Sequence, residues 1–444
     1  MQNSRTLILF QFSSLLFVSS RANLHSAMIN ESKRKTWAHP WSYREGTIIT
    51  ATILVLGFII QAAGNGVILR FAGFPWNLLA GFLFVALLII AFVLWQKHPV
   101  VKGLGGVKVA LPAILGFTLL VLLMGFVKQD VEPQSTIARL FGLAHLVHTW
   151  PFILINVYLL VLLGIVTLKR FTPFNLKNAG FFLNHFGLFL VLFSTALGSS
   201  DMQRLSMNCY EKQTESRGID ASGKMVEVPF TIELIKFNID EFRPKVTVID
   251  NQSGQIIEEK GKSPLEMLDR NAFDLINYHI EVEQFLETSV KAGDGYVATN
   301  EPGSATSAKV KVTDTKSKSE VTGWICSGSF ALQPEQLKLS GHYSLVMLPA
   351  EPRKFSSELN IRAKGGKSTT TTIEVNRPFK TDGWTIYQLG YDKVMGRWSK
   401  LSVLELVRDP WLPVVYFGIF LMMGGAAFLF ITGKPKNGGS EHVA

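Results

Sequence analysis

The chain has 444 residues, 48% of them hydrophobic, and a positive mean hydropathy, so it is too long for one ordinary domain and has a membrane-protein composition. Its net charge of +10 does not indicate a nucleic-acid-binding protein, because many basic residues lie in short segments between apolar runs, where they set topology. Two cysteines are too few for a disulfide framework or a zinc site, and Walker A, GxGxxG, HExxH and CxxC motifs are missing. These features exclude soluble nucleotide, metalloprotease and thioredoxin-like chemistry.

Residues 1–45 contain an apolar stretch, Thr6 to Val18, that is too short to cross a bilayer. The stretch fits the h-region of a signal peptide, with Arg5 as a weak n-region. The basic run Lys33 to Lys35, however, stands just before a true spanning segment and prefers the cytoplasm. We therefore expect a cytoplasmic N-terminal segment over 1–45 and a translation start at Met28.

Six charge-free runs follow, and each is long enough to span a hydrocarbon core. They are 46–69, 71–96, 109–127, 140–168, 178–200 and 410–433. Trp150-Pro151 divides the fourth run, so we expect an interfacial lead-in at 140–149 and the span itself at 150–168. The sequence predicts a membrane protein of about six transmembrane helices with a large domain between the fifth and the sixth.

Basic residues in the short connecting segments predict the orientation. If the N-terminus is cytoplasmic, the inner segments hold twelve Lys and Arg residues and the short outer loops hold three. This asymmetry places the large domain, 201–409, outside the cytoplasm and the tail, 434–444, inside it.

The outer domain is predicted to be rich in β-structure. Alternation of apolar and polar residues predicts a strand at 226–239, a hairpin around Asn251–Gly254, and shorter strands at 278–286, 308–313, 343–348, 370–375 and 384–388. Residues 289–308 and 350–368 are rich in Gly, Ser and Lys and are expected to form long exposed loops. A twisted sheet or sandwich without a catalytic constellation is the expected fold.

His185 is the one titratable group in the fifth run, which has no charged residue between Lys177 and Asp201. An imidazole within a spanning segment is costly without a partner, so it is a candidate functional group. The residues alone leave two readings open. His185 ligates a metal such as heme iron, or it forms a polar contact between packed helices, with Asn184 involved.

Three blocks resemble the ResB/CcsB family, the heme-handling subunit of the System II cytochrome c synthase. They are His148-Thr-Trp-Pro-Phe-Ile-Leu-Ile-Asn through Lys169-Arg170, the helix Leu183-Asn-His through Gly198, and Glu374 to Gln388 together with Asp409-Pro-Trp-Leu-Pro to Gly418. The spans at 46–69 and 71–96 precede the family's usual first helix and are an extension of it; residues 109–200 correspond to the family's helices.

The resemblance implies a function in cytochrome c biogenesis in the bacterial cytoplasmic (inner) membrane. It implies that His185 is an axial ligand of heme b, that a CcsA-like partner subunit supplies the other ligand, and that apocytochrome c receives the heme on its Cys-x-x-Cys-His motif. The chain would then be a subunit of a holocytochrome c synthase that is not self-sufficient. The rival interpretation is a membrane-anchored scaffold or assembly factor that binds no heme. A transporter is disfavoured, because the spans lack acid–base pairs.

Other histidines and the cysteines are weaker candidates. His145 and His148 are three residues apart and would share one helical face near the outer boundary, where they could form a heme exit site. We interpret His98 as topological, and His279, His342 and His442 as surface groups or groups with satisfied hydrogen bonds. A disulfide between Cys209 and Cys326 stays open, since sequence does not fix their separation. Gly418, Gly424 and Gly425 predict close helix packing.

Overall fold

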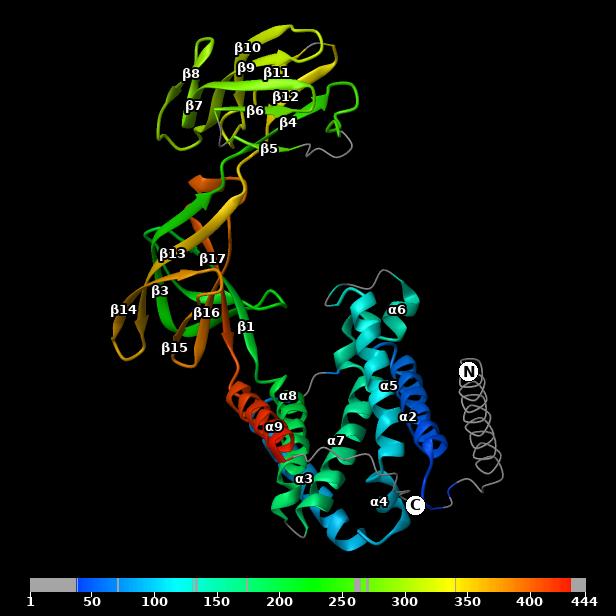
Figure 1. Cartoon of the computed structure of the whole chain (residues 1–444). Coiled ribbons are helices and arrows are strands. Elements are labelled where there is room, and N and C mark those ends of the chain that lie inside the picture. Colours follow the sequence, from blue (N-terminus) through cyan, green and yellow to red (C-terminus); the bar gives the residue numbers. More distant parts are fainter. Residues whose placement is uncertain are drawn as a thin grey trace, which may run out of the picture. The chain divides into compact units, whose positions relative to one another are not determined.

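The computed structural model describes residues 37, 39–69, 72–129, 131, 135–172, 175–258, 265–268, 271–339 and 341–432. The expected start at Met28 and the cytoplasmic tail lie outside these residues. The chain divides into two compact units (Figure 1). The helical unit comprises Met1–Asp201 and Pro410–Ala444, and the β unit comprises Met202–Asp409.

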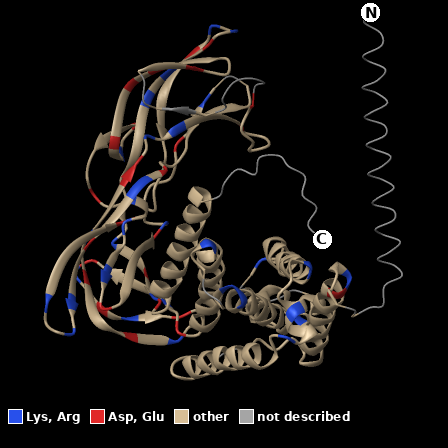
Figure 2. Cartoon of the chain, turned by 60° about the horizontal axis from the view of Figure 1, so that its bottom comes forward, with Lys and Arg blue, Asp and Glu red and all other residues tan. Residues whose placement is uncertain are grey.

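Six helices in the described part of the helical unit are long and apolar enough to cross a membrane. They are α2 (Tyr43–Ala63), α3 (Trp76–Trp95), α5 (Val107–Phe126), α7 (Trp150–Phe171), α8 (Ala179–Gly198) and α9 (Leu412–Thr432). The chain is therefore a multi-pass membrane protein, and the predicted fold class is confirmed. In Figure 2 the ribbon of these helices is almost free of the blue and red that mark charged residues, whereas Lys, Arg, Asp and Glu are scattered over the strands.

Local signals explain where the helices begin. The lead-in to the fourth span is a 3₁₀ helix, η1 (Leu143–His148), and α7 starts at Trp150 with Pro151 in its first turn, as predicted. Helix α2 starts at Tyr43, earlier than the predicted run. Ser42 and Glu45 form a capping box there, which accommodates charged residues in the first turn. The short helices α4 (Pro99–Leu104), α6 (Thr136–Leu140) and η2 (Leu176–Asn178) were not predicted.

Helices α2, α5 and α7 share one apolar core, which includes Val109, Ile155 and Leu159. Glycines bring the backbones together in this group. A Cβ on Gly57 would lie 2.5 Å from the Cα of Pro151 in α7, so α2 and α7 are in backbone contact there. Close approach of this kind maximises van der Waals contact between helices in a bilayer, where no hydrophobic force drives them together.

The carboxylate of Asp201 joins α8 to α3 and α9. One oxygen accepts a hydrogen bond from the backbone N–H of Phe74 at 2.7 Å; the other accepts from Nδ2 of Asn77 at 2.6 Å and from Nε1 of Trp411 at 2.7 Å. Desolvation raises the pKa of Asp201, but the three hydrogen bonds outweigh it and hold this pKa below its ordinary value. We call Asp201, Phe74, Asn77 and Trp411 the Asp201 junction.

The β unit contains three sheets. The first, with eight strands in the order β14-β13-β3-β2-β1-β17-β16-β15, forms lobe 1; a five-stranded sheet (β10-β9-β7-β6, with β8 on β7) and a four-stranded sheet (β11-β12-β4-β5) form lobe 2. The strands of lobe 1 are β1 (Gln203–Tyr210), β2 (Thr214–Ile219), β3 (Met225–Glu241), β13 (Pro352–Ala363), β14 (Ser368–Glu374), β15 (Phe379–Thr381), β16 (Trp384–Tyr391) and β17 (Leu401–Arg408). Those of lobe 2 are β4 (Lys245–Asp250), β5 (Glu266–Met267), β6 (Ala272–Leu275), β7 (Tyr278–Ala292), β8 (Gly295–Ala298), β9 (Ala305–Asp314), β10 (Glu320–Cys326), β11 (Leu337–Lys338) and β12 (Tyr343–Met347).

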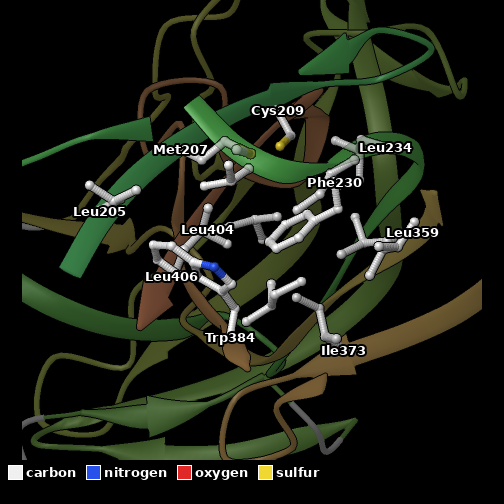
Figure 3. Close-up of a cluster of buried hydrophobic side chains, with 14 of the residues drawn as sticks. Leu205, Met207, Cys209, Phe230, Leu234, Leu359, Ile373, Trp384, Leu404 and Leu406 are labelled. Atoms are coloured by element: carbon white, nitrogen blue, oxygen red, sulfur yellow. The ribbon is translucent and has the colours of Figure 1, made fainter. Parts of the chain in front are cut away.

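The eight-stranded sheet curls around its own core (Figure 3). Phe230 of β3 and Trp384 of β16 are far apart in the strand order, yet their rings make an edge contact at 6.4 Å. Leu359, Ile373 and Leu404 complete the contact between the two ends of the sheet.

Lobe 2 is inserted between β3 and β13, which pair with each other up to Glu241 and Pro352. Its two sheets face one another across a second core, to which Val248, Ile280, Val310, Ile325 and Leu345 contribute. The β unit is therefore a curled sheet with a sandwich inserted into it.

Two predicted loops are wrong. Residues 289–308 contain the end of β7, all of β8 and the start of β9, and residues 350–368 contain β13. In both segments, serine side chains occupy buried positions, so the alternation of apolar and polar residues that predicts a strand is obscured. Ser289 and Ser307 are buried and hydrogen-bonded to each other at 2.7 Å, and Ser357 takes an inward position in β13. The predicted hairpin at Asn251–Gly254 is a turn after β4, whose return pairs through the single bridge Ile249–Ile256.

We expect Asp201→Asn to lower the stability of the purified protein in detergent. The variant loses the charge assistance of three hydrogen bonds from the starts of α3 and α9, a cost of about 1–3 kcal/mol. Because the folded-state pKa of Asp201 is lowered, its contribution is full above the ordinary aspartate pKa and is lost as the pH falls through the lowered value. Thermal unfolding of both proteins, measured from neutral to acidic pH, should therefore show a difference that shrinks on acidification.

Asp294→Asn, in the exposed turn between β7 and β8, is the matched control and should leave the unfolding midpoint unchanged. An Asp201→Asn protein as stable as the wild type at neutral pH would contradict a stabilising role for the junction.

Candidate functional site

Helix α8 fixes the tautomer of His185. Nδ1 of His185 lies 2.9 Å from the carbonyl oxygen of Phe181, one turn earlier. A carbonyl only accepts hydrogen bonds, so this contact requires the proton on Nδ1 and leaves the lone pair on Nε2. A histidine with this arrangement is prepared to ligate a metal through Nε2.

Aromatic rings line the same end of α8. The imidazole of His185 stacks on Phe181, with ring centroids 3.8 Å apart and an interplanar angle of 17°. Phe182 stacks on Phe186 at 5.5 Å and contacts Phe171 of α7 at 5.4 Å. These rings provide an apolar surface of the kind that a porphyrin face requires.

The other faces of α8 are occupied by neighbouring helices. Gly180 and Gly187 face α9, Phe189 packs near Gly164 of α7, and Leu197 packs against Gly81 of α3. At about 100° per residue, His185 lies at the edge of the α7 face, beside an arc that carries Leu188 and Leu192. Those two leucines and His185 are all partly exposed, so this arc is accessible to another molecule.

Backbone contact between α8 and α9 fixes the helix that carries His185. A Cβ on Gly418 would lie 2.9 Å from the Gly187 carbonyl oxygen, and one on Gly425 would lie 2.8 Å from the Asn184 nitrogen. The prediction of close packing is thus confirmed for Gly418 and Gly425. It is wrong for Gly424, where a Cβ would meet no atom within 4 Å.

Asn184 is the sequence neighbour of His185 but lies on a different face of α8. Its Nδ2 donates to the Gly180 carbonyl at 3.3 Å on the face turned to α9. The side chains of Asn184 and His185 thus both bond to carbonyls of α8 itself, and within the described residues neither makes the hydrogen bond between helices that the sequence left open.

His145 and His148 both lie in η1. The backbone at His145 departs from helical geometry (φ −139°, ψ 43°), so a regular i, i+3 face is interrupted there. Both side chains are partly exposed. Within the described residues, no group of three or more His, Cys, Asp or Glu side chains could hold a metal ion.

Two glutamines that the sequence analysis missed hold η1 and the start of α7. Nε2 of Gln129 donates to the Leu143 carbonyl at 2.9 Å, and its Oε1 accepts from the Leu146 N–H at 3.2 Å. Oε1 of Gln61 accepts from the Trp150 N–H at 3.1 Å. The sequence did contain a signal for them, a glutamine inside or beside an apolar run. The side-chain amide of a buried glutamine needs hydrogen-bond partners.

The remaining histidines have local functions or lie outside the description. Nδ1 of His98 accepts from the Val100 N–H and caps α4. His279 is paired with Asp274 at 2.6 Å on the surface of lobe 2, and His342 is an exposed turn residue. His442 lies outside the described residues.

The two cysteines are free, and both are buried in different clusters of the β unit. The disulfide that the sequence left open is not formed. Burial, aided by the charge of Glu215, raises the pKa of Cys209 to about 12; burial also raises the pKa of Cys326. Both thiols are therefore poor nucleophiles, which argues against a thiol relay.

We expect Gly425→Val to disrupt the α8–α9 contact next to His185, at a cost of about 1–3 kcal/mol from overpacking. Gly424→Val adds the same volume one residue earlier, where there is open space, and is the matched control. Thermal unfolding in detergent should show a lower midpoint for the first variant alone. Equal midpoints for the two variants would contradict the packing described here.

The ResB-like family model matches residues 289–400. The matched segment runs from the end of β7 to beyond η3 (Gly396–Trp398) and includes strands of both lobes. It bears out the resemblance noted in the sequence and includes the block Glu374 to Gln388. No curated protein matches the chain. His185 lies outside the matched segment, in the membrane-spanning helix that precedes the β unit.

Proposed function

We propose that this chain, a multi-pass membrane protein with a ResB-like segment at residues 289–400, is a subunit of a complex that delivers heme for cytochrome c biogenesis. The observation that supports the heme assignment is the geometry of His185. Its Nδ1 proton is engaged by the Phe181 carbonyl, so Nε2 is the nitrogen that presents a lone pair.

The residues around His185 suit heme b as cargo. Heme needs a neutral imidazole for its iron and an apolar surface for its macrocycle, and His185 with Phe181, Phe182 and Phe186 supplies both. The partly exposed arc beside His185 would face a CcsA-like partner subunit, which would supply the second axial histidine.

The chain contributes positioning rather than reactive groups. In apocytochrome c, the two thiols of a Cys-x-x-Cys-His motif add across the two heme vinyl groups, each S–H bond giving a C–S and a C–H bond. The two cysteines of this chain are buried and their thiols have raised pKa values, so they take no part in this addition. Holding heme in a fixed orientation lowers the entropic cost of the reaction.

The resemblance implies a bacterial cytoplasmic (inner) membrane, and the charge distribution supports an orientation with the β unit on the outer side. His185 is then about 12 Å from the cytoplasmic end of its run, counted from Lys177 at about 1.5 Å per residue. Heme would enter from the cytoplasm, and the β unit would dock apocytochrome c or support the partner subunit. His145 and His148, at the outer end of α7, are secondary candidates for an exit site.

Replacement of His185 by glycine tests the proposal. The purified chain with its partner should show a heme Soret band, and His185→Gly should reduce it at least about tenfold, the lower range for groups that support a metal ligand. Added imidazole should restore part of the band. His279→Gly, on the surface of lobe 2, is the matched control and should keep its heme.

A complex that matures cytochromes without any Soret band would favour the scaffold interpretation. A Soret band that is unchanged in His185→Gly would remove His185 from heme binding and would direct attention to His145 and His148.

Reporter fusions test the orientation. A reporter that is active only outside the cytoplasm should be active when fused after Arg217 and inactive when fused after Lys434, because twelve of the fifteen basic residues in short segments lie on the assigned inner side. The reverse pattern would contradict the assigned topology.

A further inference from the structure

Arg170, near the end of α7, lies over the ring of Phe181, which also stacks on His185. Its guanidinium carbon lies 4.8 Å from the centroid of the Phe181 ring, and Phe181 in turn stacks on His185 at 3.8 Å. The sum of the two distances is the upper limit on the separation of guanidinium and imidazole. Arg170 is exposed, and no ion pair with an acidic side chain is recorded for it among the described residues.

Contact with the Phe181 ring restricts the position of the Arg170 guanidinium. A guanidinium over an aromatic face gains cation–π energy, and the planar group keeps its N–H donors at its rim. The five donors match the two oxygens of a carboxylate. The arrangement therefore presents an anion-binding group no farther from the His185 imidazole than the sum of these two distances.

We propose that Arg170 binds a propionate carboxylate of the heme whose iron His185 ligates, an inference that rests on the proposed function. Heme b has an apolar rim with two vinyl groups and an anionic rim with two propionates. An anionic rim is costly in hydrocarbon without a partner, and Arg170 lies at the end of α7 where the apolar run stops. The pair His185 and Arg170 then fixes both the iron and the direction of the porphyrin.

Lys169 is the natural comparison, because it is the adjacent basic residue on the same turn and is also exposed. It carries the same charge for membrane topology but is about 100° around the helix from Arg170. No contact between Lys169 and the Phe181 ring is recorded among the described residues. A general effect of positive charge would involve both residues, whereas the stack assigns the propionate to Arg170.

The test compares heme with heme dimethyl ester, in which both carboxylates are blocked. The purified complex, stripped of heme, is titrated with each compound, and the Soret band gives the dissociation constants. Wild type and Lys169→Gln should prefer heme by about tenfold or more, the range for a hydrogen bond to a charged group. Arg170→Gln should bind the two compounds almost equally, and His185→Gly should lose affinity for both.

If Arg170→Gln does not assemble with its partner, Arg170→Lys replaces it in the test. This variant keeps the positive charge but lacks the planar set of N–H donors of a guanidinium. It should lower the preference for heme several-fold. Preference that is unchanged in the Arg170 variants, with binding still dependent on His185, would overturn the inference and leave the proposed function intact. Binding of heme that is independent of His185 would instead overturn the proposed function, and this inference with it.

Discussion

The Asp201 junction is the constraint on which the arrangement of the helical unit depends. The polypeptide leaves this unit after Asp201 and returns at Pro410, and the carboxylate ties both crossing points to the start of α3. Apolar surfaces alone give little preference for one helix register over another within lipid, so directional hydrogen bonds have a large influence. The junction gives α3 a clear structural purpose.

The position of His185 follows from the same restraints. The C-terminal end of α8 is fixed by the hydrogen bonds of Asp201. Along its length, α8 is in backbone contact with α9 at Gly187 and Gly418. The backbone of His185 cannot shift without moving these contacts. A rigid helix and an internal hydrogen bond together set the direction of Nε2, which is how proteins usually orient a metal ligand. The arc beside it, with Leu188 and Leu192, is partly exposed.

The sequence predicted the spans well, because a charge-free run of sufficient length has few other stable structures in a bilayer. It also singled out His185 as a candidate heme ligand, which stays a prediction. It did not predict the Asp201 junction, since Asn77 and Asp201 are 124 residues apart and nothing local links them. Strand β13 was mistaken for a loop because Ser357 occupies a core position. That serine is stabilised by Gln388 and Ser402 on strands that follow it in the chain.

The insertion of lobe 2 between two paired strands has a consequence for how the β unit can diversify. Its entry and exit, at Glu241 and Pro352, are already neighbours in the sheet of lobe 1, so residues added or removed in lobe 2 leave the register of β3 on β13 untouched. Lobe 1 can therefore remain constant while the surface and length of the inserted sandwich change. An insertion between two paired strands thus lets one part of a domain vary without disturbing the sheet that carries it.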